Sequence, residues 1–224
     1  MASRDPDELR EELESVEFAT NEQTLAELRS EARETVNAQI NTLDDIDTKA
    51  SKILRLNIVL IGILVSGLSI IAQFGNGPNF PEISNFLNGY VTLGTVSIVL
   101  STAFAAMTYT ASEQDIGLSH ENLSALLQAD LDRSEAETLM LKNYIVRINF
   151  NRSTNVRNIP LIQLTILFAV IAVVSFVLGV HEALVGPVPG LYVFGTLLVI
   201  LTVVAVSGVV KQIYRAIRDY IEWR

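Results

Sequence analysis

Hydrophobic residues in this chain are concentrated in four uninterrupted runs, which cover residues 53–74, 90–110, 159–180 and 191–210. At about 1.5 Å per residue of α-helix, a run of roughly 20 residues crosses the apolar layer of a bilayer, which is about 30 Å thick. Arg55 is the only charged residue in these runs. It lies near the start of the first run, from where its long side chain reaches back to the headgroups. The pattern predicts an all-α membrane protein with four transmembrane helices.

The segments that connect these runs differ in charge. Residues 75–89 and 181–190 contain neither Lys nor Arg, and all sixteen basic residues lie elsewhere in the chain. Because basic residues stay on the cytoplasmic side of a membrane, we expect the two short segments to face outward and both termini to be cytoplasmic. Turn residues in these segments, such as Gly77-Pro78 and Gly186-Pro187, predict two helical hairpins. We expect both hairpins to lie in the plasma membrane.

The polar segments are predicted to form cytoplasmic helices around these hairpins. Five regions result: N-terminal helices (1–52), the first transmembrane hairpin (53–110), a helical connection (111–158), the second hairpin (159–210) and a basic amphipathic tail (211–224). Asp5 before Pro6 is typical of a helix start, here of a short helix that ends near Phe18. Thr20 or Asn21 is expected to cap the helix that follows.

That next helix is predicted to run without interruption over residues 22–74. Its cytoplasmic part carries an apolar stripe at steps of three and four, which needs a partner to pack against. The expected partner is the central connection, predicted to hold two helices, the second opened by a capping box of Ser134 and Glu137. The long stripe consists of Leu25, Leu28, Ala32, Val36, Ile40, Leu43 and Ile46. The two connecting helices present Leu123, Leu126, Leu127 and Leu131, and then Leu141, Ile145 and Ile148.

Small and weakly polar residues line one face of each of the first two runs. In the first run they are Gly62, Ser66, Ser69 and Gln73. In the second run they are Gly94, Ser97, Ser101, Ala105 and Thr108. Such a face either allows helix backbones to approach closely or lines a water-filled path in an oligomer. Asn57, Gln163 and Thr165 allow the same two interpretations, and solvation at the inner membrane surface accounts for Asn57 and Gln163.

The tail also allows two interpretations. Ile213, Ile217 and Ile221 share one helical face, and basic residues occupy other positions. The tail therefore either lies along the inner headgroups or extends the fourth transmembrane helix.

Charge and composition exclude several classes of function. The net charge of −9 in 224 residues argues against nucleic-acid binding, which needs a basic surface. Four of the sixteen basic residues are Lys, a bias that suggests a high-salt source, although ordinary acidic solvated helices explain it equally well. The chain has no cysteine, so disulfides, thiol catalysis and thiolate metal sites are excluded.

The sequence contains no recognisable enzyme motif. Zinc-protease, P-loop and dinucleotide-binding patterns are absent. In the predicted topology His120 and His181 lie on opposite sides of the membrane, so they share no metal ion. The four runs contain no Asp or Glu that would relay protons. We therefore expect a protein that is not an enzyme and that holds no metal or cofactor.

A short motif stands where the cytoplasmic helix meets the first run. Asp47, Lys49, Ala50 and Ser51 resemble the D-x-K-A-S signature found at this place in the Pycsar effector transmembrane family, a group related in style to SLATT-type proteins. The similarity extends over about residues 35–180, and the fourth run exceeds that pattern. Lys142 and Tyr144 are in a position similar to a later Lys/Tyr pair of the family. Without any family, Lys49 is explained as an anchor to anionic headgroups.

The resemblance implies an antiviral effector that damages the host's inner membrane after it senses a cyclic nucleotide or a similar signal. We therefore expect a homo-oligomer in the lipid bilayer that forms a pore or disrupts the membrane, with a nucleotide second messenger or a signalling protein as partner. The alternative is a non-conducting scaffold whose cytoplasmic helices recruit another protein. A transporter is a third hypothesis, weakened by the lack of charge within the runs.

Overall fold

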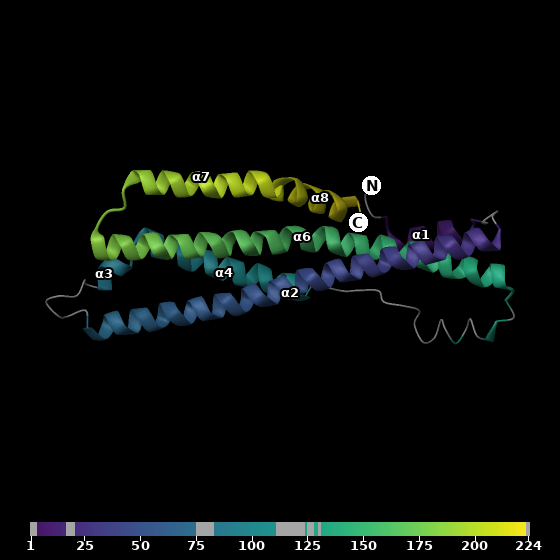
Figure 1. The fold of residues 1–224 in the computed structure, drawn as a ribbon, viewed down its shortest axis with the longest axis horizontal. Coiled ribbons are helices and arrows are strands. Elements are labelled where there is room, and N and C mark those ends of the chain that lie inside the picture. Colours follow the sequence, from purple (N-terminus) through teal and green to yellow (C-terminus); the bar gives the residue numbers. More distant parts are fainter. Residues whose placement is uncertain are drawn as a thin grey trace. The chain divides into compact units, whose positions relative to one another are not determined.

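The computed structural model describes residues 4–16, 21–74, 83–110 and 131–222, together with residues 124, 128 and 129. These residues are almost entirely helical, and no strand occurs among them. The helices are α1 (Pro6–Glu14), α2 (Glu22–Phe74), α3 (Ile83–Phe86), α4 (Gly89–Thr110), α6 (Arg133–Val185), α7 (Gly190–Ser207) and α8 (Val209–Glu222) (Figure 1). The predicted turn at Gly77-Pro78, the stripe at Leu123, Leu126 and Leu127, and His120 lie outside the described residues.

Four of these helices, α2, α4, α6 and α7, are long and apolar enough to cross a membrane. Their most apolar stretches have mean hydropathies of 2.2, 1.7, 2.8 and 2.3, respectively. The prediction of an all-α membrane protein with four membrane-spanning helices is thereby confirmed. The hairpin arrangement and the side on which the polar helices lie remain predictions.

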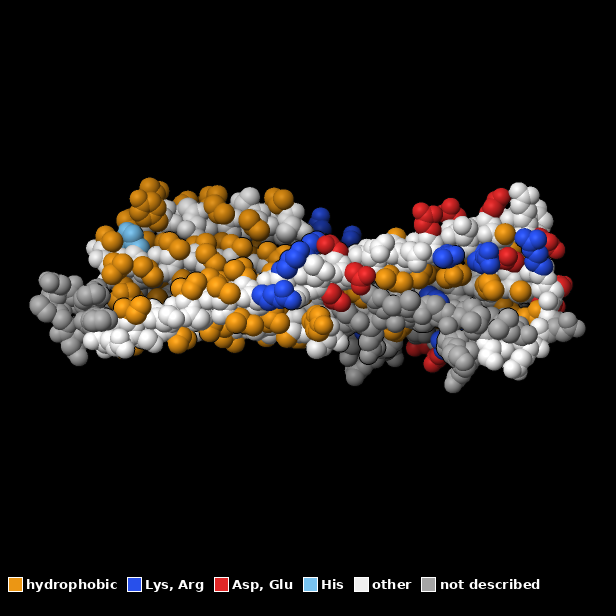
Figure 2. Space-filling view, turned by 60° about the horizontal axis from the view of Figure 1, so that its bottom comes forward, with side chains coloured by type: hydrophobic (Ala, Val, Ile, Leu, Met, Phe, Trp, Pro, Cys, Tyr) orange, Lys and Arg blue, Asp and Glu red, His pale blue; other side chains and the backbone are white. Residues whose placement is uncertain are grey.

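The chain divides into two compact units. Unit 1 comprises Met1–Asp45, Ala111–Asn158 and Tyr214–Arg224, and unit 2 comprises Ile46–Thr110 and Ile159–Ile213. Helices α2 and α6 each contribute residues to both units. On the face seen in Figure 2, most of the charged side chains lie on unit 1, and hydrophobic side chains predominate on unit 2.

The first two helices begin where the sequence predicts. Asp5 caps α1, because its side-chain oxygen accepts hydrogen bonds from the amides of Asp7 (2.8 Å) and Glu8 (3.2 Å). That helix ends at Glu14, earlier than the predicted residue 18. Asn21, the second of the two expected caps, accepts a bond from the amide of Thr24 at 2.8 Å. The single helix predicted over residues 22–74 is confirmed as α2.

The start of α6 differs from the prediction. The capping box is formed by Asp132 and Glu135: the Glu135 amide donates to Asp132 Oδ1 (2.8 Å), and the Asp132 amide donates to Glu135 Oε2 (3.0 Å). The expected pair of Ser134 and Glu137 is wrong, because Glu137 is engaged in an ion pair with Arg29. From this start α6 runs as one helix to Val185, with Pro160 inside it.

The helix of the fourth apolar run ends three residues before the end of that run at residue 210. Gly208 adopts φ 68°, a left-handed conformation that suits glycine and ends helices. Helix α7 therefore stops at Ser207, and α8 begins at Val209. The interpretation of the tail as a plain extension of the fourth helix is wrong, because this residue separates the two.

The core of unit 1 lies between the first part of α2 and the first part of α6. Leu25, Ala32 and Leu141 form a buried cluster, and Tyr144, Ile145 and Ile148 pack against it. The predicted apolar stripes of α2 and α6 thus pack against each other. Leu28 is the exception, because its side chain is 45% exposed.

Candidate functional site

The small-residue face of α4 is packed inside unit 2. The buried residues of α4 include every member of the face predicted in the second run: Gly94, Ser97, Ser101, Ala105 and Thr108. Gly94 lies directly against α6, because a Cβ atom added there would be 2.6 Å from Cδ1 and Cε1 of the Phe176 ring. In a single copy of the chain this face therefore packs closely against a neighbouring helix.

A second close contact joins α4 to α6 near the start of α4. A Cβ atom added at Gly179 would be 2.5 Å from Cγ2 of Val91 and 3.0 Å from its backbone nitrogen. Asn88 Nδ2 donates to the Gly179 carbonyl (2.8 Å), and Asn88 Oδ1 accepts from the Val91 amide (3.0 Å). Asn88 thus caps α4 and binds α6 at once. The sequence analysis missed this residue, although an Asn just before a helical run is typical of an N-cap.

A buried polar junction connects α2, α4 and α6 inside unit 2. Asn57 on α2 is 0% exposed. Its Nδ2 donates to Ser101 Oγ (2.9 Å) and Thr102 Oγ1 (3.2 Å), both on α4. Ser101 Oγ in turn donates to the carbonyl of Thr165 on α6 (2.9 Å). One amide and three hydroxyl-bearing residues therefore link three of the four candidate spans.

The interpretation of Asn57 as solvated at the membrane surface is wrong, because the residue is fully buried. Its Oδ1 atom has no hydrogen-bond partner among the described residues. An unsatisfied buried carbonyl costs about 1–3 kcal/mol. Gln163 is partly buried, and Thr165 is buried with its Oγ1 bonded to the Leu161 carbonyl at 2.9 Å.

Replacing Asn57 by leucine should change the stability of the protein by no more than about 1 kcal/mol. Two interhelical bonds are lost, at about 0.6 kcal/mol each, but the unsatisfied Oδ1 is removed as well. The hydroxyls of Ser101 and Thr102 keep their acceptors, the carbonyls of Thr165 and Ile98. Asn57→Ala loses the same bonds and leaves a cavity, so it should be less stable than Asn57→Leu by about 1–2 kcal/mol.

Thermal melting in mild detergent measures whether Asn57→Leu is more stable than Asn57→Ala. A loss of more than about 2 kcal/mol in Asn57→Leu would contradict it, and would mean that Oδ1 has a partner such as an ordered water.

The small-residue face of α2 is exposed, in contrast to that of α4. Each member of the face predicted in the first run is exposed: Gly62, Ser66, Ser69 and Gln73. At about 100° per residue, this face lies opposite the side of α2 that carries Asn57 and Leu64. A Cβ atom at Gly62 would meet nothing within 4 Å. The apolar stretch of α2 is only 6% buried, against 33% for α4 and for α6.

Helix α7 is packed even more loosely. None of its residues is buried. Between α7 and the second part of α6 lies an apolar groove of about 630 Å³, whose lining includes Val173, Val177, Leu191 and Val199. Both α2 and α7 therefore expose most of their apolar surface in a single copy of the chain.

The D-x-K-A-S-like motif lies on α2 at the beginning of unit 2. Ala50 is buried (1% exposed), Asp47 and Ser51 are partly buried, and Lys49 is exposed. Ala50 shares the inward side of α2 with Ile46 and Asn57, whereas Lys49 and Lys52 point outward. The motif thus combines a small packing residue with outward cations next to an apolar stretch.

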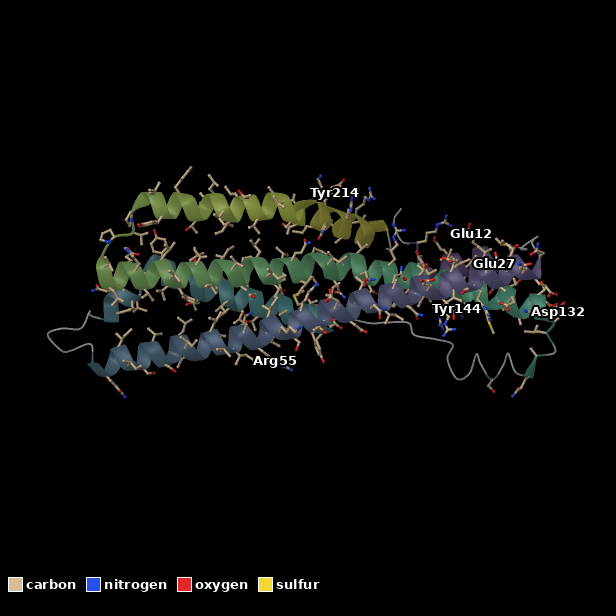
Figure 3. All side chains as sticks on the ribbon, viewed as in Figure 1. Glu12, Glu27, Arg55, Asp132, Tyr144 and Tyr214 are labelled. Carbon is tan, nitrogen blue, oxygen red and sulfur yellow. The ribbon has the colours of Figure 1, made fainter. Side chains whose placement is uncertain are left out.

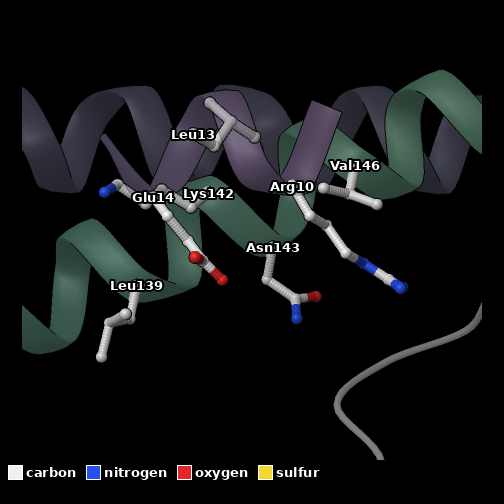
Figure 4. Close-up of a pocket in the computed structure, with 7 residues that line it drawn as sticks. All are labelled: Arg10, Leu13, Glu14, Leu139, Lys142, Asn143 and Val146. Carbon is white, nitrogen blue, oxygen red and sulfur yellow. The ribbon is translucent and has the colours of Figure 1, made fainter. Parts of the chain in front are cut away.

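Lys142 and Tyr144 do not form one site. Tyr144 packs against the core of unit 1 (Figure 3). Lys142 lines a shallow cavity of about 240 Å³ between α1 and α6 (Figure 4). The other lining residues are Arg10, Leu13, Glu14, Leu139, Asn143 and Val146. Two cations and one carboxylate lie around this cavity, and one of the cations, Arg10, also pairs with Asp7.

Three polar contacts join α2 to α6 within unit 1. Arg29 Nε lies 3.0 Å from Glu137 Oε2, in an ion pair that is close but not aligned for a hydrogen bond. Gln39 Nε2 donates to the Ile148 carbonyl (3.2 Å), and Asn155 Nδ2 donates to the Gln39 carbonyl (3.1 Å). We call these three contacts the α2–α6 clasp.

No group of three or more His, Asp or Glu side chains that would hold a metal ion occurs in the described part of the chain. In comparisons with known proteins, no family model, no curated protein and no solved structure matches the sequence or fold.

Proposed function

We propose that this protein is an effector of the plasma membrane that acts as a homo-oligomer and forms a pore or disrupts the bilayer. The observation that carries the proposal is the exposed face of α2 with Gly62, Ser66, Ser69 and Gln73. In a lone copy the side chains of Ser66 and Gln73 would face hydrocarbon, where exposed polar groups are costly, whereas Ser69 Oγ already donates to the Val65 carbonyl at 2.8 Å. A second copy or a water-filled path would provide partners, and the small side chains allow close approach.

The regulation that we propose involves unit 1 and its α2–α6 clasp. Unit 1 would lie in the cytoplasm with both termini and keep the spans closed until a signal loosens the clasp. The support is that α2 and α6 each contribute to both units, so a change in unit 1 acts on the same helices that supply two spans. The resemblance of Asp47, Lys49, Ala50 and Ser51 to Pycsar effectors suggests a nucleotide second messenger as the signal and antiviral defence as the role.

Disulfide formation tests the oligomer directly, because the chain has no cysteine of its own. In Ser66→Cys, mild oxidation of proteoliposomes should give several-fold more crosslinked dimer than in Ile63→Cys. Ile63 is an exposed control on the same helix, about 90° away from the small-residue face. Equal crosslinking of both variants would contradict a defined interface on this face.

Ion flux from proteoliposomes separates an effector from a scaffold. Flux is expected from the full-length chain, either spontaneously or with a cyclic nucleotide added, and should be lost in Ser66→Leu but kept in Ile63→Leu. A monomer that releases no ions under any candidate nucleotide would instead favour the non-conducting scaffold.

A further inference from the structure

Helix α8 exposes an apolar face along its whole length. Val210, Tyr214, Ile217 and Ile221 are 67%, 68%, 55% and 66% exposed, respectively. Their spacing of four, three and four residues places them on one side of the helix. A large apolar side chain left in water forgoes most of the free energy that its burial would contribute. A face of four such residues therefore needs an apolar partner.

The two other faces of α8 differ in character. Val209 is buried, and Gln212, Ile213 and Ala216 are partly buried, so these four residues form the inward face. Lys211, Arg215 and Arg218 form a third face, about 100° around the helix from the exposed apolar one. The cations thus border the apolar face on the side away from the protein, as in helices that lie at a membrane surface.

The position of α8 in the chain identifies the apolar partner. Helix α7 has no buried residue and its most apolar stretch has mean hydropathy 2.3, which suits a span surrounded by lipid. Gly208 ends α7, and α8 begins one residue later. The exposed face of α8 therefore starts where the chain leaves the hydrocarbon, and the boundary between acyl chains and headgroups is the apolar medium within its reach.

We propose that α8 is an interfacial helix that binds a bilayer surface containing anionic phospholipid. Tyr214, Ile217 and Ile221 insert at the level of the upper acyl chains, and Lys211 and Arg215 contact headgroup phosphates. Asp219 and Glu222 reduce the net charge of the last turn. Binding therefore requires the apolar face and the cations together, and it weakens when either is removed.

The test places single cysteines, labelled with an environment-sensitive fluorophore, in the otherwise cysteine-free full-length chain in proteoliposomes. Quenching by brominated lipid should be strong at Tyr214→Cys and Ile217→Cys and weak at Arg215→Cys. Adding phosphatidylglycerol to phosphatidylcholine vesicles should increase quenching at Ile217→Cys. Arg215→Glu should lower the ratio of membrane-bound to unbound α8 by about fivefold or more. Arg33→Glu, an exposed charge reversal on α2, is the matched control and should have no effect.

Weak quenching at both apolar positions would overturn the proposal. Intermolecular disulfides at Ile217→Cys with no quenching would overturn it in favour of a second copy of the chain as the partner. Quenching that is the same with and without phosphatidylglycerol would overturn the role of anionic headgroups. All variants change exposed residues, so melting temperatures close to that of the unmodified chain are expected and serve as the folding check.

Discussion

Gly179→Leu is expected to separate α4 from α6 and to lower the stability of unit 2 by about 3 kcal/mol. Even a Cβ atom at this position meets Val91 at 2.5 Å, and the second neighbour is the Val91 backbone nitrogen, which cannot rotate away. The leucine would also displace Asn88, whose amide binds the Gly179 carbonyl. Thermal melting in detergent, followed by circular dichroism, should show a lower midpoint.

The matched control is Gly195→Leu on α7. Nothing lies within 4 Å of a Cβ atom at Gly195, and leucine favours a helix more than glycine does. This control should change stability by no more than about 0.5 kcal/mol, or raise it slightly. Equal melting temperatures for the two leucine variants would contradict the close packing of α4 on α6.

Arg29→Met is expected to destabilise unit 1 by about 2 kcal/mol. The Glu137 side chain is only 10% exposed, so removing its cation leaves a largely buried charge without compensation. Glu137→Met should cost less, because Arg29 is 39% exposed and its guanidinium reaches water. The double variant should recover at least part of the loss, since two apolar side chains replace a pair that was costly to bury.

Arg10→Met is the control for this series. Arg10 pairs with Asp7 at 3.2 Å, and both side chains are more than half exposed (59% and 88%). Its removal should change stability by less than about 0.5 kcal/mol. Protease resistance of the polar helices in proteoliposomes reports on unit 1. If Arg29→Met and Arg10→Met are digested at the same rate, the buried ion pair contributes nothing to the clasp.

The positions of the four spans could be predicted from the sequence because they depend only on chain length and apolarity. A run of about 20 apolar residues forms a helix wherever it contacts lipid, and no tertiary information is needed. The fourth run continues past the end of α7 because hydropathy does not register a left-handed glycine. Gly208 lies between Ser207 and Val209 within an otherwise apolar run, so only its backbone conformation reveals the break.

Which small-residue face is buried could not be predicted. The faces of the first two runs have nearly the same composition, yet the one on α4 is packed inside and the one on α2 is exposed. The burial of Asn57 could not be predicted either. Its distance from the end of a run suggested a solvated position, but the helix phase places it inward, opposite hydroxyls on α4.

Capping was predicted correctly at Asp5, where one candidate stood alone, and wrongly at the start of α6, where two candidates overlapped. Asp132 and Ser134 are each followed by Glu at the third position. The choice between them is made by Arg29, more than 100 residues earlier in the chain, which holds Glu137 in an ion pair. A motif within one segment carries no information about such a distant partner.

Pro160 gives the two long helices different stiffness. It lacks an amide hydrogen, so the carbonyl of Val156 loses its usual partner and the ring crowds that turn. The residue lies within two positions of Asn158, where α6 passes from unit 1 to unit 2. Helix α2 makes the same passage at Asp45 with neither proline nor glycine nearby. Bending at this passage therefore costs less free energy in α6 than in α2. In a motion of this protein, α6 would bend near Pro160 and α2 would stay straight.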